Sequence, residues 1–135
     1  MKSFLAFFLL ASVASSAYGK MQNITVLGQV ICDKKTLSNI KVELRERDTL
    51  DPDDTLQAGT TARDGKFRLF GKDNEITSIT PYLRITHSCE VPQKKGKKCE
   101  RITDIDIPQS KVGTVFNMNF VNMNVHGHTG KVVCK

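Results

Sequence analysis

Short runs of alternating apolar and polar residues recur along this chain, and they restrict its fold more than any other feature. In the clearest run, residues 40–47, Ile40, Val42 and Leu44 alternate with charged side chains. A period of two is typical of a strand with one buried face, and no helical period is sustained anywhere. The chain is therefore predicted to be all-β, an antiparallel sandwich of seven or eight strands. The other predicted strands are residues 24–31, 56–62, 66–70, 82–87, 102–107, 115–125 and 131–134.

Three local patterns refine this prediction. Asp64-Gly65 lies between two predicted strands, which favours a hairpin there. The apolar alternation slips by one residue at Phe120-Val121, which indicates a β-bulge. One helical turn is allowed between Glu75 and Thr80, just before Pro81.

The N-terminus has the pattern of a secretory signal peptide. Lys2 precedes about ten mostly apolar residues, which are too few to span a bilayer. Small residues follow, and cleavage is expected after Gly19, with Ala17 as the alternative. We therefore predict a signal peptide at residues 1–19, one domain at residues 20–135, and a secreted, extracellular protein. No later stretch is apolar enough to form a transmembrane segment.

An even number of cysteines in a small exported domain favours disulfides over metal thiolates. Four cysteines allow three pairings, and the sequence alone does not select one. We expect Cys89–Cys99, which would close a loop, and Cys32–Cys134, which would tie an early strand to the C-terminus. Asn23 begins an N-glycosylation sequon near the start of the mature chain, which suits an exposed acceptor.

Positive charge is concentrated between Cys89 and Cys99. The chain has 20 lysines and arginines against 14 acidic residues, a formal net charge of +6. In an extracellular protein such charge favours an anionic partner such as lipid head groups, a glycosaminoglycan or an acidic protein. Nucleic acid is not expected, because no aromatic residues interleave the lysines. The candidate anion-binding residues are Lys94, Lys95, Lys97, Lys98 and Arg101.

Two other polar segments have side chains that could bind a metal. The acidic residues 48–54 have carboxylates but lack the ligand spacing of an EF-hand, so a solvated loop is the preferred interpretation. His126 and His128 would share one face of a strand, yet no third ligand accompanies them. We therefore predict no metal and no cofactor. No nucleophile-and-base arrangement supports catalysis, so the protein is not expected to be an enzyme.

The order and spacing of several short motifs resemble the nematode transthyretin-like family, a large group of small secreted proteins. The matching pieces run from Val26-x-Gly28 with Cys32, through Thr61-x-x-Asp-Gly-x-Phe67, to Ile79-x-Pro-Tyr-Leu-x-Ile-x-His-x-Cys89, Ile107-Pro108 and Cys134. The resemblance implies a transthyretin-like β-sandwich, an exported protein with no established catalytic role, and a packed or hydrogen-bonded His87. The chain ends Val-Val-Cys-Lys, unlike the Tyr-Arg-Gly-Ser end of the related hydroxyisourate hydrolases, which argues against that activity.

Some members of that family act as extracellular bridges between phosphatidylserine on dying cells and an engulfment receptor. The basic loop fits such a role, so a non-enzymatic bridging protein is our preferred interpretation. Two alternatives stay open. One is a carrier of a small hydrophobic ligand in a cavity or in a channel between subunits of a homo-oligomer. The other is a secreted signalling or effector protein that binds protein only.

Overall fold

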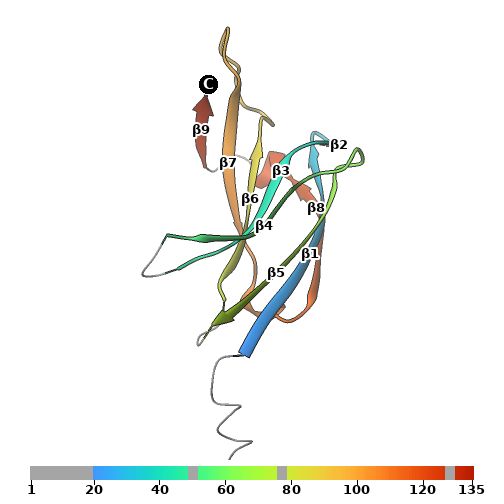
Figure 1. Ribbon diagram of the computed structural model, residues 1–135. Coiled ribbons are helices and arrows are strands. Elements are labelled where there is room, and N and C mark those ends of the chain that lie inside the picture. Colours follow the sequence, from blue (N-terminus) through green and yellow to red (C-terminus); the bar gives the residue numbers. More distant parts are fainter. Residues whose placement is uncertain (1–19, 49–51, 76–78, 127–129) are drawn as a thin grey trace, which may run out of the picture.

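Strands account for most of the residues that a computed structural model of the chain describes, namely 20–48, 52–75, 79–126 and 130–135. Within these ranges nine strands form two sheets, which confirms the predicted all-β sandwich (Figure 1). The strands are β1 (Lys20–Cys32), β2 (Lys35–Thr36), β3 (Lys41–Glu46), β4 (Asp54–Thr60), β5 (Lys66–Glu75), β6 (Pro81–His87), β7 (Cys99–Asp106), β8 (Val115–Asn122) and β9 (Lys131–Cys134).

The five-stranded sheet has the order β4-β3-β6-β7-β9, and each pair in it is antiparallel. In the four-stranded sheet β1 pairs with β2, β5 and β8. Since β5 and β8 both pair with residues 25–27 of β1, they lie on opposite edges of that strand. The β1–β8 pair is parallel, whereas the prediction was an antiparallel sandwich throughout. The two-residue strand β2 brings the count above eight.

The core lies between the inner faces of the two sheets. Ile24, Val26 and Val30 of β1 have no exposed surface, and neither have Val42 and Leu44 of β3. Burying such side chains stabilises the fold by about 1.5–3 kcal/mol each. The alternation read from residues 40–47 therefore gave the correct inner face. The rest of the central cluster includes Phe67, Leu69, Ile79, Leu83, Ile85, Val121 and Met123.

The predicted hairpin turn at Asp64-Gly65 is present, and the Ala62 N–H closes it by donating to the Lys66 carbonyl at 2.9 Å, but the two strands that it joins do not pair with each other. The Gly65 N–H donates to the Ala62 carbonyl at 2.9 Å, and Gly65 adopts a φ of +82°. However, β4 pairs with β3, whereas β5 pairs with β1 in the other sheet. The turn thus carries the chain between sheets, a distinction that turn chemistry alone does not make.

A bulge is present in β8, but its position differs from the predicted one. Leu27 pairs with Asn117 and Gln29 pairs with Phe120, so Met118 and Asn119 both oppose Gly28. Asn119 adopts a φ of +58°, which accommodates the extra residue. Phe120 consequently faces outward and is 67% exposed, instead of sharing the inner face with Phe116 and Met118.

The helical turn expected between Glu75 and Thr80 includes residues 76–78, which lie outside the described residues, as does the predicted signal peptide. Helical turns are instead described at η1 (Gln109–Lys111) and α2 (Met123–His126). Among the described residues no helix is both long and apolar enough to cross a bilayer.

Candidate functional site

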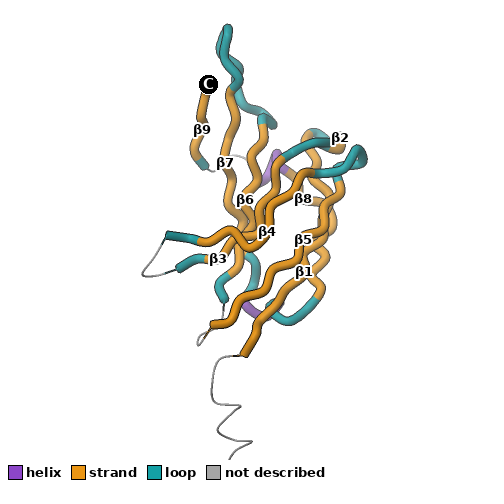
Figure 2. Tube along the Cα trace, in the orientation of Figure 1, coloured by secondary structure: helices purple, strands orange, loops and turns teal. Residues whose placement is uncertain are grey.

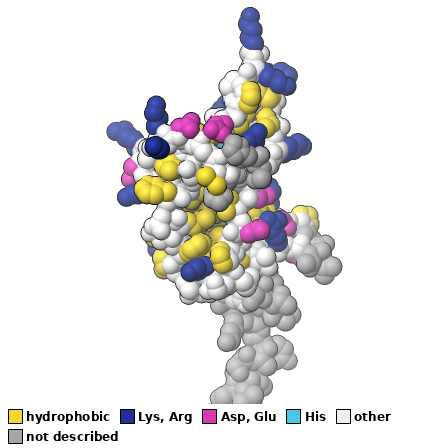
Figure 3. All heavy atoms as spheres, turned by 180° about the vertical axis from the view of Figure 1, so that it is seen from behind, with side chains coloured by type: hydrophobic (Ala, Val, Ile, Leu, Met, Phe, Trp, Pro, Cys, Tyr) yellow, Lys and Arg dark blue, Asp and Glu magenta, His cyan; other side chains and the backbone are white. Residues whose placement is uncertain are grey.

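The predicted basic loop joins β6 to β7 and projects beyond the sheets (Figures 1 and 2). We call residues 88–98 the lysine loop. Its four lysines, at positions 94, 95, 97 and 98, are all exposed. The Lys97 N–H donates to the Lys94 carbonyl at 3.0 Å, and Gly96 at φ +75° completes this tight turn. Figure 3 shows Lys and Arg side chains gathered at this projecting end.

The disulfide pairing that we expected is wrong. Cys89 is bonded to Cys32 and Cys99 is bonded to Cys134. Cys89 lies at the start of the lysine loop and Cys99 directly follows its end, but each is held by a different part of the chain. The first bond connects β1 in one sheet to the start of the loop, and the second connects β7 to β9. All four cysteines are in disulfides, so none offers a free thiol.

An amide side chain closes the base of the lysine loop in place of the expected disulfide. Gln93 Nε2 donates to the Cys99 carbonyl at 2.9 Å and to the Val91 carbonyl at 3.1 Å, while Gln93 Oε1 accepts from the Cys99 N–H at 2.9 Å. The Gln93 amide thus bonds to both backbone groups of Cys99, as a paired residue of a neighbouring strand would. Val91 is buried beneath the loop, so the lysines stand on a packed base.

The C-terminal residue adds a fifth lysine to this end of the molecule. Lys98 and Lys135 exchange backbone hydrogen bonds of 2.8 and 2.9 Å, which extends the β7–β9 pair, and Lys135 is exposed. Sequence reasoning missed this residue. A sequence prediction that paired Cys99 with Cys134 would have identified the adjacent Lys98 and Lys135 as neighbours.

Arg101 lies apart from the lysines of the loop tip. It is on β7 directly opposite His87, and it is partly buried. Since alternate strand residues share a face, Arg101 has the same orientation as the buried residues Cys99 and Thr103. The structure thus brings together the four predicted lysines and places the predicted arginine beside the core.

His87 supports the start of the lysine loop. The ring has no exposed surface, and its Nδ1 accepts a hydrogen bond from the Cys89 N–H at 3.1 Å. The ring proton is therefore on Nε2, which donates to Thr103 Oγ1 at 2.9 Å. Burial, aided by the charge of Arg101, lowers the pKa of His87 to about 4. The hydrogen-bonded role implied by the family resemblance is confirmed.

A second charged group surrounds Tyr82 on the outer face of the five-stranded sheet. The Tyr82 hydroxyl donates to Asp53 Oδ2 at 2.8 Å and accepts from Arg45 Nε at 2.9 Å. The Arg47 guanidinium lies 4.2 Å from the ring centroid. Burial raises the pKa of Tyr82, which favours the protonated hydroxyl that donates to Asp53.

The described part of the acidic loop also has a structural role. Asp53 Oδ1 accepts a hydrogen bond from the Asp48 N–H at 3.1 Å. That bond, together with the bond from Tyr82, lowers the pKa of the Asp53 carboxyl. Residues 49–51 lie outside the described residues. The loop contributes one carboxylate, from Asp54, to a group whose other members are Glu46 and Asp73, with all ligand atoms within 4.8 Å of one another. Such oxygen atoms suit a hard divalent cation.

The remaining predicted sites are described only in part. His128 lies outside the described residues, and only the backbone of His126 is described, at the end of α2. Asn23 is an exposed β1 residue opposite Lys72 of β5. Exposure suits a glycosylation acceptor, and glycosylation of Asn23 stays a prediction.

Comparison with known proteins gives consistent matches. A family model described as the transthyretin-like family matches residues 27–108. Transthyretin-like protein 16 of Caenorhabditis elegans is 40% identical over 135 residues, which covers all of both chains. Transthyretin-like protein 33 of the same nematode is 37% identical, over 87% of this chain and 85% of the relative. Transthyretin-like protein 2 is 35% identical, over 78% of this chain and 74% of the relative.

Proposed function

The chain belongs to the nematode transthyretin-like family, and from this premise we propose that it is a secreted binding protein without catalytic activity. Its lysine loop recognises an anionic phospholipid surface, phosphatidylserine on dying cells, and a second surface contacts an engulfment receptor. One observation carries this proposal. Among the described residues, Lys98 is the only lysine of the loop tip in an ion pair, at 3.8 Å from Glu100.

The charge at the loop tip is sufficient for useful binding. A lysine near an anionic leaflet gains about 1 kcal/mol, so Lys94, Lys95, Lys97 and Lys135 together supply up to about 4 kcal/mol. This attraction is screened within about 8 Å at physiological salt, so binding weakens as salt rises. Val91 is buried and Pro92 is the one exposed apolar residue of the tip, so contact is electrostatic rather than inserted.

The base of the lysine loop favours simultaneous contact by several lysines. The Gln93 bonds, the Lys97–Lys94 turn and the two flanking disulfides order the backbone before binding. A preordered surface loses less conformational entropy on binding than a flexible one. Opposed lysines that would separate in a free peptide therefore meet the membrane together.

Vesicle co-sedimentation tests the proposal directly. The processed chain should bind vesicles of phosphatidylcholine with phosphatidylserine at about 0.15 M salt, but not vesicles of phosphatidylcholine alone. Changing Lys94, Lys95, Lys97 and Lys98 to Glu should reduce binding at least about tenfold. Vesicles in which phosphatidylglycerol replaces phosphatidylserine show whether charge alone is recognised.

A matched control separates the loop from net charge. The variant in which Lys35, Lys41, Arg63 and Lys72 become Glu has the same formal charge, and all four residues are exposed and lie outside the lysine loop. It should retain most of the binding. Equal losses in both variants, or absence of binding by the original chain, would contradict the lipid role.

Bridging also requires a receptor-facing surface. β4 is the edge strand of the five-stranded sheet farthest from β9, and so from the strand that flanks the lysine loop. Edge strands can receive a partner strand through their free backbone groups. Phagocyte membranes should therefore be captured by vesicle-bound protein but not by vesicles alone, and absence of capture would contradict the bridging role.

A further inference from the structure

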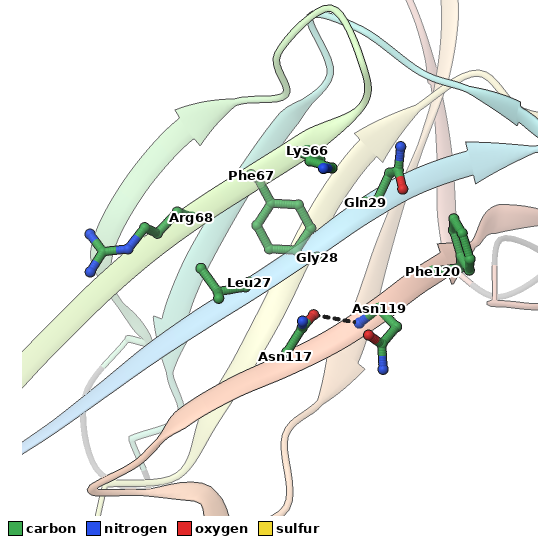
Figure 4. Close-up of a pocket in the computed structure, with 9 residues that line it drawn as sticks. All are labelled: Leu27, Gly28, Gln29, Lys66, Phe67, Arg68, Asn117, Asn119 and Phe120. Carbon is green, nitrogen blue, oxygen red and sulfur yellow. Dashed lines mark hydrogen bonds between the residues drawn. The ribbon is translucent and has the colours of Figure 1, made fainter.

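A hollow of about 590 Å³ lies on the four-stranded sheet, formed by β1, β5 and β8 (Figure 4). None of its lining residues belongs to the lysine loop. Its volume is within the range of about 300–1,000 Å³ that is typical of small-molecule sites. The hollow is therefore a candidate for a binding activity separate from that proposed for the loop.

The strand register places two rows of side chains across this surface. Arg68, Leu27 and Asn117 form one row, and Lys66, Gln29 and Phe120 form the next. The residues that alternate with them, such as Phe67 and Val121, are buried in the core. Both rows consequently face outward, with cations on β5 and an aromatic ring on β8.

The bulge in β8 is what brings Phe120 to this surface. Without the extra residue at Met118–Asn119, the alternation would turn Phe120 toward the core. The Asn119 N–H donates to Asn117 Oδ1 at 2.9 Å, which holds the bulged conformation (Figure 4). β-Bulges often re-aim a side chain beside a functional site. A phenyl ring that is 67% exposed is unfavourable in water unless something covers it.

The charge of the hollow is wholly positive. Among the residues that the structure describes, Lys66 and Arg68 are its charged lining residues and no carboxylate lines it. Within the described part of the chain neither cation takes part in an ion pair. The nearest acid in sequence, Asp64, accepts a hydrogen bond from the Lys66 backbone N–H at 3.1 Å. Arginine presents a fork of N–H donors that matches a carboxylate.

We propose that this hollow binds a soluble amphiphilic carboxylate, a molecule with one anionic head and an apolar tail. Lys66 and Arg68 receive the head, while Leu27 and Phe120 cover the tail. The concave shape favours a free molecule over a membrane, because a bilayer surface reaches only protruding groups. The Asn117 amide lies on β8 beside Phe120, across β1 from the cations, and its N–H groups add a further donor to the lining of the hollow.

Isothermal titration calorimetry with dodecanoate, below its micelle concentration, tests the proposal. Saturable binding to the processed chain is expected, with dodecanol binding more weakly because it lacks the charge. The variant K66Q/R68Q should weaken dodecanoate binding at least about tenfold and leave dodecanol binding unchanged. F120N should weaken binding of both compounds, since it removes the ring that covers the tail.

The control K41Q/R63Q removes two exposed cations that do not line the hollow, and it should bind dodecanoate like the original chain. The lysine-loop variant should also bind dodecanoate normally, while K66Q/R68Q should keep its vesicle binding, so failure of one proposal is distinguishable from failure of the other. No saturable dodecanoate binding, equal affinity for dodecanol, or binding unchanged by both hollow variants would overturn the assignment.

Discussion

Two charge-rich regions of the five-stranded sheet differ in how their charges are neutralised. Around Tyr82 the arginines have acidic partners: Arg45–Glu43 at 3.4 Å, Arg47–Asp106 at 2.7 Å and Arg84–Asp104 at 2.9 Å. At the tip of the lysine loop the described structure has one such pair, at 3.8 Å. Charges that are paired around a buried ring stabilise the fold, whereas charges gathered without partners are available to a ligand. The number of charged residues alone does not distinguish these roles.

The largest expected effect comes from removing the ring at the centre of the paired region. Tyr82→Ala should lower the free energy of unfolding by about 3–5 kcal/mol, because a fully buried aromatic side chain is lost. Urea denaturation measures this change. Neutralising Lys94, Lys95 and Lys97 to Gln should change stability by no more than about 0.5 kcal/mol. Similar losses in the two variants would abolish the distinction between the regions.

Acid should expose the link between His87 and the lysine loop. The pKa of His87 is about 4 in the folded chain and about 6.5 when unfolded, so between these values the unfolded chain binds the proton more tightly. This contribution to stability is complete above about pH 6.5 and is lost as pH falls toward 4, for a total of about 3 kcal/mol.

Urea denaturation at several pH values measures that loss. His87→Asn keeps an acceptor for the Cys89 N–H but does not titrate, so it should show a smaller loss over the same range. The carboxylates titrate in both proteins, and the difference between them isolates the histidine. Identical pH profiles would mean that His87 does not control acid stability.

Gln93→Ala should have a moderate effect, because it removes the amide that closes the loop base. Loss of the three hydrogen bonds should cost about 1–2 kcal/mol and speed hydrogen exchange at the Cys99 amide. Native-state hydrogen exchange gives both values. Lys95→Ala, in the same loop, is the control and should leave that amide protected. An unchanged Cys99 exchange rate in Gln93→Ala would show that the loop is ordered by other contacts.

The smallest effect concerns the ion pairs themselves. A double-mutant cycle on Arg84 and Asp104 should give a coupling energy of at most about 1 kcal/mol, since both side chains are about 30% exposed. The same cycle on Lys98 and Glu100 should give a value near zero, because Lys98 is 77% exposed. Equal coupling would mean that the two regions differ in number of pairs but not in pair strength.

The local pattern of the chain predicts eight of the nine described strands, since alternation directly reflects one buried face. It misses the two-residue β2, and residues 123–125, predicted as part of a strand, lie in α2 instead. Partnerships between distant segments were not predictable in the same way. Asp64-Gly65 predicted a turn correctly, yet whether the flanking strands pair depends on the sheet that each one joins. Phe120 was placed inward because a slip in alternation gives the presence of a bulge but not the residue at which it occurs.

The candidate site shows the same limit. Four lysines close in sequence were recognised as a cluster, whereas Lys135 was missed because only the Cys99–Cys134 bond brings it near. Arg101 was grouped with them by proximity in sequence, but strand geometry turns it toward His87. For the disulfides, four cysteines leave the connectivity undetermined until the sheet order is known.

The disulfide connectivity has one more consequence, for cleavage by trypsin-like proteases. The two bonds close consecutive rings, Cys32 to Cys89 and Cys99 to Cys134, that do not overlap in sequence. The lysine loop thus contains the only covalent connection between the two rings. It also has four lysines, and trypsin-like proteases cut after lysine and arginine. One nick there would release two separate pieces on a non-reducing gel after denaturation, whereas a nick inside either ring would release none. The exposed lysine loop is thus also the place where a single hydrolysed peptide bond divides the protein.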